Sequence, residues 1–457
     1  MFRRALVLFV FLLAGPPLAA QSEDNIIRLK LKPAGEPSPA LKYQLLPDVP
    51  DQSPGNAALL YYRAFSPEWY SWRKQPKVYE KIEAAMTAPL ADLARTDLGW
   101  VTNSGQLREL DLGARREYCD WDLTTRMRTE GIRLLLPDMQ AFRELSKLLA
   151  LRTRFYIADR QYDKAVTSLQ TGMALARHIG EAPLLIGLLV AVSGAEGQLA
   201  EIETLIQAPG APNLYWALTD LPRPFFDLRK PFGGEKLFLL AEMPLLKDIE
   251  TVRFGPEQVK ALAAQFEGSL RWDDNRSPRT QQGPLGLVAL AIRTYPRAKK
   301  ALAAEGWKAE DLEAMPTLQV VCIHSMREYL KVRDDVFKWV GLPAWQARPE
   351  LQRVQNEMVA RRSNLGPEPF IDLIAPGLQV CNATLRVERH VAALRTIEAI
   401  RLHAAANDGR LPATLADIHL VPVPDDPTTG KSFVYTVQGD QFTLTGPVPA
   451  GGESYQI

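Results

Sequence analysis

The chain has few cysteines, and it has no apolar run long enough to span a bilayer. Cys119, Cys322 and Cys381 are far apart, so the sequence contains no CxxC redox or zinc motif. Export would permit one disulfide in any of three pairings. Three buried, unpaired cysteines are the alternative, and both interpretations stay open at this point.

An excess of charge of one sign is also missing. The sequence holds 54 Lys and Arg against 53 Asp and Glu. Removing the first twenty residues takes away two arginines and no acids, which leaves 52 against 53 and a net charge near −1. This balance gives no long-range attraction to nucleic acid or to an anionic membrane, so we expect no nucleic-acid partner.

Signatures of catalysis are absent as well, because no GxSxG, HExxH or GxGxxG pattern occurs. Thr429 to Ser432 matches the tail of a phosphate-binding loop, but Asp425 stands where its first glycine is required. The histidines are scattered without ligand spacing, which predicts surface or partly buried helix residues. We therefore predict no catalytic residue, cofactor or metal ligand; the histidines are His178, His324, His390, His403 and His419.

Two groups of carboxylates are candidate sites. In the segment 115–122, a helix would place Arg116 and Asp120 four residues apart for an ion pair, and Glu117 with Asp120 could form a glycosidase-type pair. A structural ion-pair cluster beside a buried Trp121 is the favoured interpretation. Near the C-terminus a calcium loop would need six to eight oxygens, and a solvated turn is favoured; the candidate ligands are Asp417, Asp425, Asp426 and Asp440.

The N-terminal sequence predicts export. Arg3 and Arg4 precede an apolar run and a small-residue cleavage site, so we expect a signal peptide over residues 1–20. An uncleaved anchor is the alternative, and we expect no transmembrane span in the mature chain. Residues 21–54, rich in proline and charge, predict a flexible leader. The expected location is the periplasm or the outside of the cell.

The body of the chain has helical periodicity almost throughout. We predict a helical domain over 55–208, then a Pro- and aromatic-rich connector and a second helical region over 209–376. The segment 107–130 is predicted as one helix, and the apolar segment 184–195 as part of a buried helix that continues to Leu205. The hairpin 139–178 resembles a tetratricopeptide repeat in Tyr156, Tyr162, Ala165 and Leu169, over one repeat only, and an ordinary helical hairpin is the alternative.

Residues 377–457 predict a small α+β module. An apolar stripe from Val380 to Ala404 indicates one long helix that ends at Gly409. Phe433, Tyr435 and Val437 alternate on one strand, and a turn at 439–440 leads to a second. The predicted fold class is therefore mainly α, a helical-hairpin body followed by a long helix and a two-stranded hairpin.

This last module resembles the pseudopilins of bacterial secretion systems. The residues that carry the resemblance are those of the helix ending at Gly409, then Leu411-Pro412, Asp426-Pro427, Gly430, Phe433 and Tyr435. A pilin carries its helix at the N-terminus, whereas here the module comes last, so assembly into a fibre is not implied. The whole chain resembles exported bacterial proteins that have a helical body and no assigned activity.

These patterns favour a non-catalytic protein of the cell envelope that binds or scaffolds another envelope protein. One alternative is an envelope hydrolase whose carboxylates are assembled by the fold. The other is an accessory component of a secretion or pilus-like apparatus, which the pseudopilin resemblance suggests.

Overall fold

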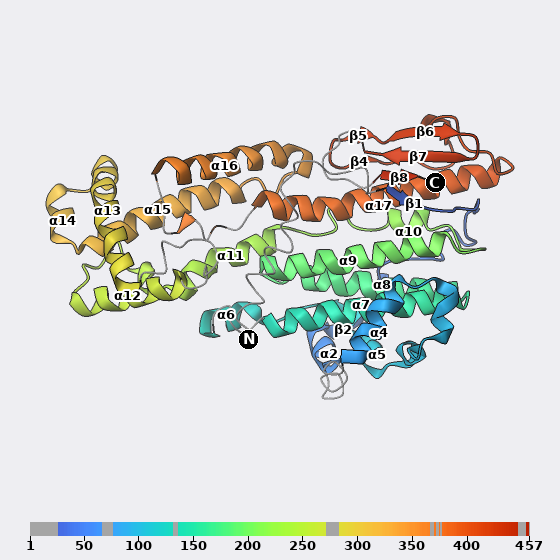
Figure 1. Cartoon of the computed structure of the whole chain (residues 1–457), viewed down its shortest axis with the longest axis horizontal. Coiled ribbons are helices and arrows are strands. Elements are labelled where there is room, and N and C mark those ends of the chain that lie inside the picture. Colours follow the sequence, from blue (N-terminus) through green and yellow to red (C-terminus); the bar gives the residue numbers. More distant parts are fainter. Residues whose placement is uncertain are drawn as a thin grey trace. The chain divides into compact units, whose positions relative to one another are not determined.

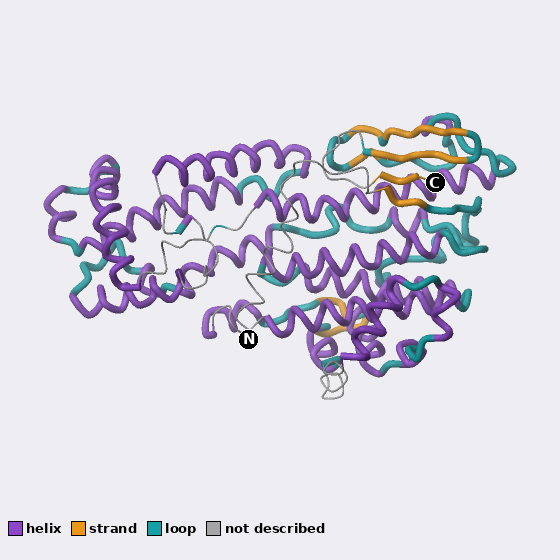
Figure 2. Tube along the Cα trace, viewed as in Figure 1, coloured by secondary structure: helices purple, strands orange, loops and turns teal. Residues whose placement is uncertain are grey.

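The computed structural model describes residues 26–65, 76–130, 136–270, 283–365, 370–371, 374, 377–446 and 454–456. The expected signal peptide, and the polar segment 273–282, lie outside these residues. The described chain is mainly helical with a small C-terminal sheet, which confirms the predicted fold class at that level (Figures 1 and 2). The described residues divide into a larger unit within 26–123, 137–231 and 380–456 and a smaller unit within 124–136 and 232–379.

Three successive helices form the frame of the larger unit: α7 (Leu136–Ala158), α8 (Tyr162–Gly180) and α9 (Leu185–Ile206). The first two form the predicted hairpin. Arg160 (φ 58°) takes the left-handed conformation at the turn, where the N–H of Gln161 reaches the carbonyl of Tyr156 at 2.8 Å. Helices α8 and α9 run side by side over most of their length (Figure 1). Gly172 permits this approach, because a Cβ there would lie 2.4 Å from Cδ of Gln198.

Helix α9 is the predicted apolar helix, and it is longer than the apolar run itself. Leu199, Ile202 and Leu205 are fully buried, as expected. Within the described part of the chain, α9 is the one helix whose length and composition would allow it to cross a membrane, and 67% of its most apolar window is buried inside the protein.

The predicted long C-terminal helix is α17 (Gly377–Ala406). It ends as expected, with Gly409 at φ 84° and its N–H bonded to the carbonyl of Ala404. The hairpin of β6 (Val434–Gln438) and β7 (Gln441–Thr445) follows, with Phe433 and Phe442 buried. The sheet has four strands rather than the predicted two, in the order β1-β8-β7-β6, because β1 (Ile26–Arg28) and β8 (Ser454–Gln456) extend it.

The described part of the expected leader lies against the larger unit. The N–H of Ala34 bonds to the carbonyl of Arg401, and Leu45 is fully buried. Lys42 and Tyr43 both bond to the carboxylate of Asp163 on α8. The composition of this segment suggested flexibility because composition cannot show such contacts, whose partners lie more than a hundred residues away in the sequence.

The predicted helix over 107–130 is wrong, because three separate elements occupy it: α5 (Gly105–Ala114), β3 (Arg116–Tyr118) and α6 (Leu123–Glu130). Strand β3 pairs in parallel with β2 (Ser53–Asn56). The side chain of Asn56 holds both the N–H and the carbonyl of Asp120. A long-range backbone pairing therefore overrides the local helical periodicity.

In the connector, the rings of Tyr215, Phe225 and Phe226 are buried, as expected for a packed segment.

The larger unit also contains shorter helices and strands. These elements are η2 (Val49–Asp51), α2 (Ala58–Arg63), α4 (Pro76–Thr87), η3 (Leu90–Arg95), η4 (Gly99–Asn103), α10 (Tyr215–Thr219), η9 (Leu415–Asp417), β4 (Asp425–Asp426) and β5 (Lys431–Ser432).

The smaller unit is helical among its described residues. The buried Gln319 fixes a loop on its core, because its amide donates to the carbonyls of Ile249 and Val252 and accepts from the N–H of Phe254. Its elements after residue 228 are α11 (Arg229–Glu242), η6 (Pro244–Lys247), α12 (Pro256–Leu270), α13 (Gly283–Ala304), α14 (Ala309–Ala314), α15 (Thr317–Phe337) and α16 (Ala344–Leu365).

Candidate functional site

The segment 115–122, which was expected to be helical and to hold an ion-pair cluster in preference to a catalytic carboxylate pair, does not lie on a helix. Glu117 and Asp120 are exposed, and the guanidinium of Arg116 donates to the carbonyl of Pro54 instead of pairing with Asp120. The carboxylate of Asp120 accepts the N–H of Asp122. The expected ion-pair cluster is therefore wrong, whereas Trp121 is buried as expected and donates its indole N–H to the carbonyl of His178.

The acidic residues near the C-terminus divide into two kinds. Asp425 is exposed and accepts from the hydroxyl of Ser432, as a solvated turn would predict. Asp426 is fully buried, which contradicts that interpretation, and it faces the guanidinium of Arg389 at 3.5 Å. Gly446 packs directly on this guanidinium, since a Cβ there would lie 1.3 Å from an Arg389 nitrogen. Asp426 thus joins the sheet region to α17.

Among the described residues, no three His, Cys, Asp or Glu side chains are grouped so that they could hold a metal ion. All three cysteines are buried, and no disulfide joins any two of them. Lys431 and Ser432 form strand β5, and strand β6 follows them. A phosphate-binding loop would be followed by a helix whose N-terminus holds the phosphate, so the rejection of such a loop at residues 429–432 is confirmed.

His390 of α17 lies between two glutamates of α9. Its Nδ1 is 2.9 Å from Glu196 and its Nε2 is 3.0 Å from Glu203. Burial alone would lower the pKa of His390, but the two carboxylates outweigh burial and raise this pKa to about 10. Both ring nitrogens therefore donate at neutral pH, so the imidazole offers no lone pair for proton abstraction or for a metal. Sequence spacing missed this cluster because its members are almost two hundred residues apart.

A third glutamate of α9, Glu201, faces α7 instead of α17. It lies 3.5 Å from the guanidinium of Arg154 on α7. Burial raises the pKa of Glu201 to about 7, although Arg154 opposes the shift. A carboxyl with a pKa in this range could exchange protons, but its side chain is only 4% exposed, so solvent and substrate do not reach it.

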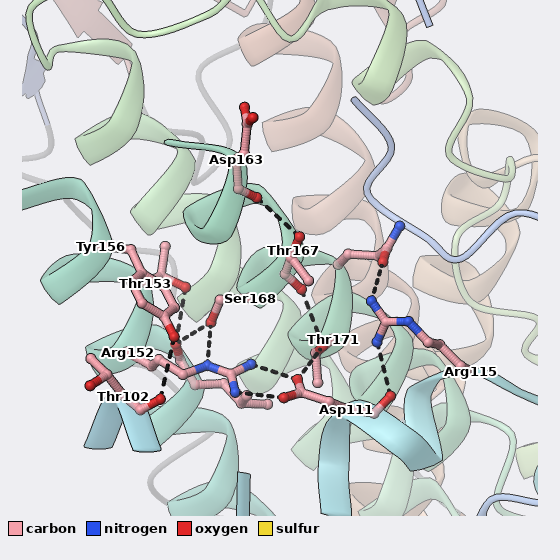
Figure 3. Close-up of polar contacts among 12 residues, drawn as sticks. Thr102, Asp111, Arg115, Arg152, Thr153, Tyr156, Asp163, Thr167, Ser168 and Thr171 are labelled. Carbon is pink, nitrogen blue, oxygen red and sulfur yellow. Dashed lines mark hydrogen bonds and ion pairs between the residues drawn. The ribbon is translucent and has the colours of Figure 1, made fainter. Parts of the chain in front are cut away.

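A polar network fixes α5 against α7 and α8 (Figure 3). The guanidinium of Arg152 binds both carboxylate oxygens of Asp111, at 2.7 and 2.9 Å, and its Nε donates to the hydroxyl of Ser168. The hydroxyl of Thr171 also donates to Asp111. Bidentate pairs of this kind fix orientation as well as distance. One turn further, Arg115 bonds to Gln170, whose amide donates to the carbonyl of Leu46.

Helix α5 presents its other side to solvent together with α2. Arg63 of α2 pairs with Glu109 of α5 at 2.9 Å. Leu59 lies one turn before Arg63 and is 68% exposed, and Leu112 lies one turn after Glu109 and is 47% exposed. Because residues three and four apart share one side of a helix, both leucines lie beside the ion pair. We call these four residues the α2–α5 face.

A rigid contact beneath this surface holds the two helices together. A Cβ at Gly113 would lie 2.5 Å from the ring of Tyr61, so the ring packs directly on the α5 backbone. Tyr61 also stacks on Trp121 with ring centroids 5.6 Å apart, and its hydroxyl lies 2.7 Å from Nδ1 of His178 on α8. The α2–α5 face, two exposed leucines beside one ion pair, thus lies on a fixed helical support.

The smaller unit contains a groove of about 190 Å³ between α15 and α16. Val332, Val354 and Met358 contribute its apolar lining. The charged groups at its rim already have partners: Lys331 and Arg361 pair with Glu328. The two acids of the rim, Asp335 and Glu357, both pair with Arg353. A charged ligand would have to displace these contacts, so we favour the α2–α5 face as the candidate site.

Comparison of the chain with protein-family models, with curated proteins and with solved structures found no match. The function is therefore argued from the geometry of the described residues.

Proposed function

We propose that this chain is a non-catalytic protein of the cell envelope that binds another envelope protein through the α2–α5 face. The observation that carries the proposal is the exposure of Leu59 and Leu112 beside the Arg63–Glu109 ion pair. Buried apolar anchors with a polar rim are the usual composition of a protein interface. The Arg152–Asp111 network supports the proposal because it holds α5 in place before a partner arrives, which lowers the entropy cost of binding.

The alternative of an envelope hydrolase has less support. The carboxylates that the fold gathers, Glu196 and Glu203, are engaged by His390, and Glu201 is engaged by Arg154. The proposed export to the periplasm or the outside rests on the N-terminal sequence alone.

The pseudopilin resemblance remains a proposal of its own. A long helix followed by a β-hairpin supports it. Helix α17, however, is buried on nearly all sides from Val387 to Leu402 and supplies core residues of the larger unit. This burial favours a structural use of the module within the chain over a role as an accessory part of a pilus-like apparatus.

The test is site-specific cross-linking in the cells that make the protein. A photo-reactive residue at Leu59 is expected to capture one envelope protein, and Leu59→Ser with Leu112→Ser is expected to abolish co-purification of that protein while the thermal midpoint is unchanged. Leu420, which is 58% exposed in the same unit, is the matched control position. Equal capture from positions 59 and 420, or unchanged co-purification by the double variant, would contradict the proposal.

A further inference from the structure

In the smaller unit, the connection between α15 and α16 has an unusual composition for a surface segment, and so do the first residues of α16. Residues 338–348, which span both, are called the α15–α16 turn. Residues 339–347 read Trp-Val-Gly-Leu-Pro-Ala-Trp-Gln-Ala and contain no charge, in a chain that is 23% charged. Lys338 and Arg348 stand immediately before and after them. Surface connections are normally rich in small polar residues. An uncharged apolar run with Trp339 in the connection and Trp345 on the first turn of α16 therefore needs a separate explanation.

Two of the four large side chains of this turn are exposed to solvent. Trp345 is 50% exposed and Leu342 is 44% exposed. Trp339 and Val340 are half-buried. Ala347, by contrast, is only 1% exposed and packs inward. The turn therefore presents a compact apolar surface while its far end is fixed in the core of the unit.

Backbone hydrogen bonds hold the turn in one conformation. The N–H of Leu342 bonds to the carbonyl of Trp339 at 3.1 Å, and the N–H of Ala347 bonds to the carbonyl of Pro343 at 3.0 Å. The side chain of Lys338 lies over the Trp339 ring, with its Nζ 5.0 Å from the centroid. Because the turn is already ordered, burying its side chains in a partner would cost little conformational entropy.

The charges around the turn favour a phosphate-bearing surface. Lys338 pairs with Asp335, but Arg353 pairs with the same carboxylate, so a phosphate can replace Asp335 at Lys338 without leaving that carboxylate unpaired. Glu350, two residues after Arg348, also pairs with Arg353. The acid Asp334 is paired with Arg333. Arg348 is half-exposed at the other end of the apolar run. Tryptophan prefers the boundary between lipid headgroups and acyl chains, and flanking Lys and Arg interact with lipid phosphates.

We propose that residues 338–348 form a membrane-docking turn that inserts Leu342 and Trp345 into the headgroup region of an anionic phospholipid bilayer. Lys338 and Arg348 contact the phosphates on either side. This surface belongs to a different unit from the α2–α5 face and does not depend on it. The occupant is a lipid surface, and attachment by a short apolar loop is reversible, unlike a membrane span.

The test uses the mature full chain with Leu342→Cys labelled by an environment-sensitive fluorophore. The three native cysteines are buried, so the label is expected to react at the new position. With vesicles of phosphatidylglycerol and phosphatidylethanolamine, we expect a blue-shifted emission that nitroxide-labelled lipids quench. Val288→Cys is the matched control, because Val288 is 53% exposed on α13 of the same unit, and its label should show neither change.

Two further variants separate the apolar from the charged contribution. Leu342→Ser with Trp345→Ser should lower the vesicle-bound fraction by ~tenfold or more without changing the thermal midpoint. Lys338→Gln and Arg348→Gln should each weaken binding about fivefold on anionic vesicles and have little effect on phosphatidylcholine vesicles. The proposal is overturned if the full chain does not bind vesicles, or if positions 288 and 342 are quenched equally. It is also overturned if the serine variant instead abolishes self-association in the absence of lipid.

Discussion

His390 holds a proton between two glutamates of α9, and this makes the larger unit less stable as the pH rises into the alkaline range. Its pKa in the folded chain, about 10, is above the ordinary value of 6.5. The stabilisation is therefore fully present below about pH 6.5 and is lost as the pH rises toward 10. One proton corresponds to a slope of about 1.4 kcal/mol per pH unit within that window.

The variant His390→Gln should remove this slope. The free energy of unfolding is measured in urea between pH 6 and 10. For the unaltered chain we expect it to fall with pH more steeply than for the variant, by about 1.4 kcal/mol per pH unit, which corresponds to one proton. His419→Gln is the control, because His419 is exposed. Parallel pH profiles for the unaltered chain and His390→Gln would show that the imidazole is neutral in the folded state.

Two glycines of neighbouring helices predict opposite effects of the same substitution. Gly172→Ala should destabilise the larger unit by ~1–3 kcal/mol, since the added methyl would overlap the amide of Gln198 between α8 and α9. Gly197→Ala should stabilise it by ~0.5–1 kcal/mol, because open space surrounds Gly197 and alanine favours the helix. Urea midpoints of both variants measure the difference. A destabilised Gly197→Ala would contradict the open space around Gly197, and an unchanged Gly172→Ala would show that Gly172 does not set the spacing of α8 and α9.

At the scale of elements, the N-terminal segment is held to α17 by one arginine. Arg401 donates to the carbonyls of Lys32 and Ala211 and pairs with the fully buried Glu398 at 2.7 Å. The amide of Asn213 adds a bond to the carbonyl of Glu398, at 2.9 Å. Three segments distant in the sequence therefore meet at one guanidinium.

Arg401→Met should release this junction. We expect a loss of ~3–5 kcal/mol in stability, because the substitution leaves the carboxyl of Glu398 buried without its partner. Amide hydrogen exchange of residues 30–36 should become faster. Adding Glu398→Gln should recover part of the lost stability, since a neutral amide is less costly to bury than an unpaired carboxylate. Unchanged exchange in Arg401→Met would mean that other contacts hold the segment.

Periodicity in the sequence predicted those elements whose contacts are local or whose apolar stripe is long. The hairpin of α7 and α8 and the long helix α17 are examples, and their ends were marked by Asp159–Gln161 and by Gly409. Strand β3 was missed because its hydrogen bonds go to residues 53–56. Strand β1 was missed as a sheet member because its partner, β8, lies at the other end of the chain.

Candidate residues were harder to predict than elements, because burial and charge pairing depend on distant residues. A pair of aspartates before a proline predicts a turn, but only the contact with Arg389 reveals that Asp426 is buried. The sequence of α5 shows Asp111 and Leu112 side by side, yet one lies in the Arg152 network and the other faces solvent. That distinction requires the positions of α2, α7 and α8.

At the scale of the whole molecule, the three thiols report on both units. Cys119 belongs to the larger unit and Cys322 to the smaller one, and burial raises the pKa of both thiols above the ordinary range. Cys381 lies near the start of α17 and is also buried. Since the thiolate is the reactive form, the folded chain should resist alkylation at all three positions.

Alkylation followed by peptide mass spectrometry along a urea gradient tests this expectation. We expect three intact thiols in the native chain, no change in thermal midpoint on adding reductant, and labelling of each cysteine only as its own unit unfolds. The labelling midpoints of Cys119 and Cys322 then give the stability of each unit separately. A native mass lower by two hydrogens would reveal a disulfide. Rapid labelling of Cys119 or Cys322 without urea would mean that the core around it opens at low free-energy cost, which the packing of both units argues against.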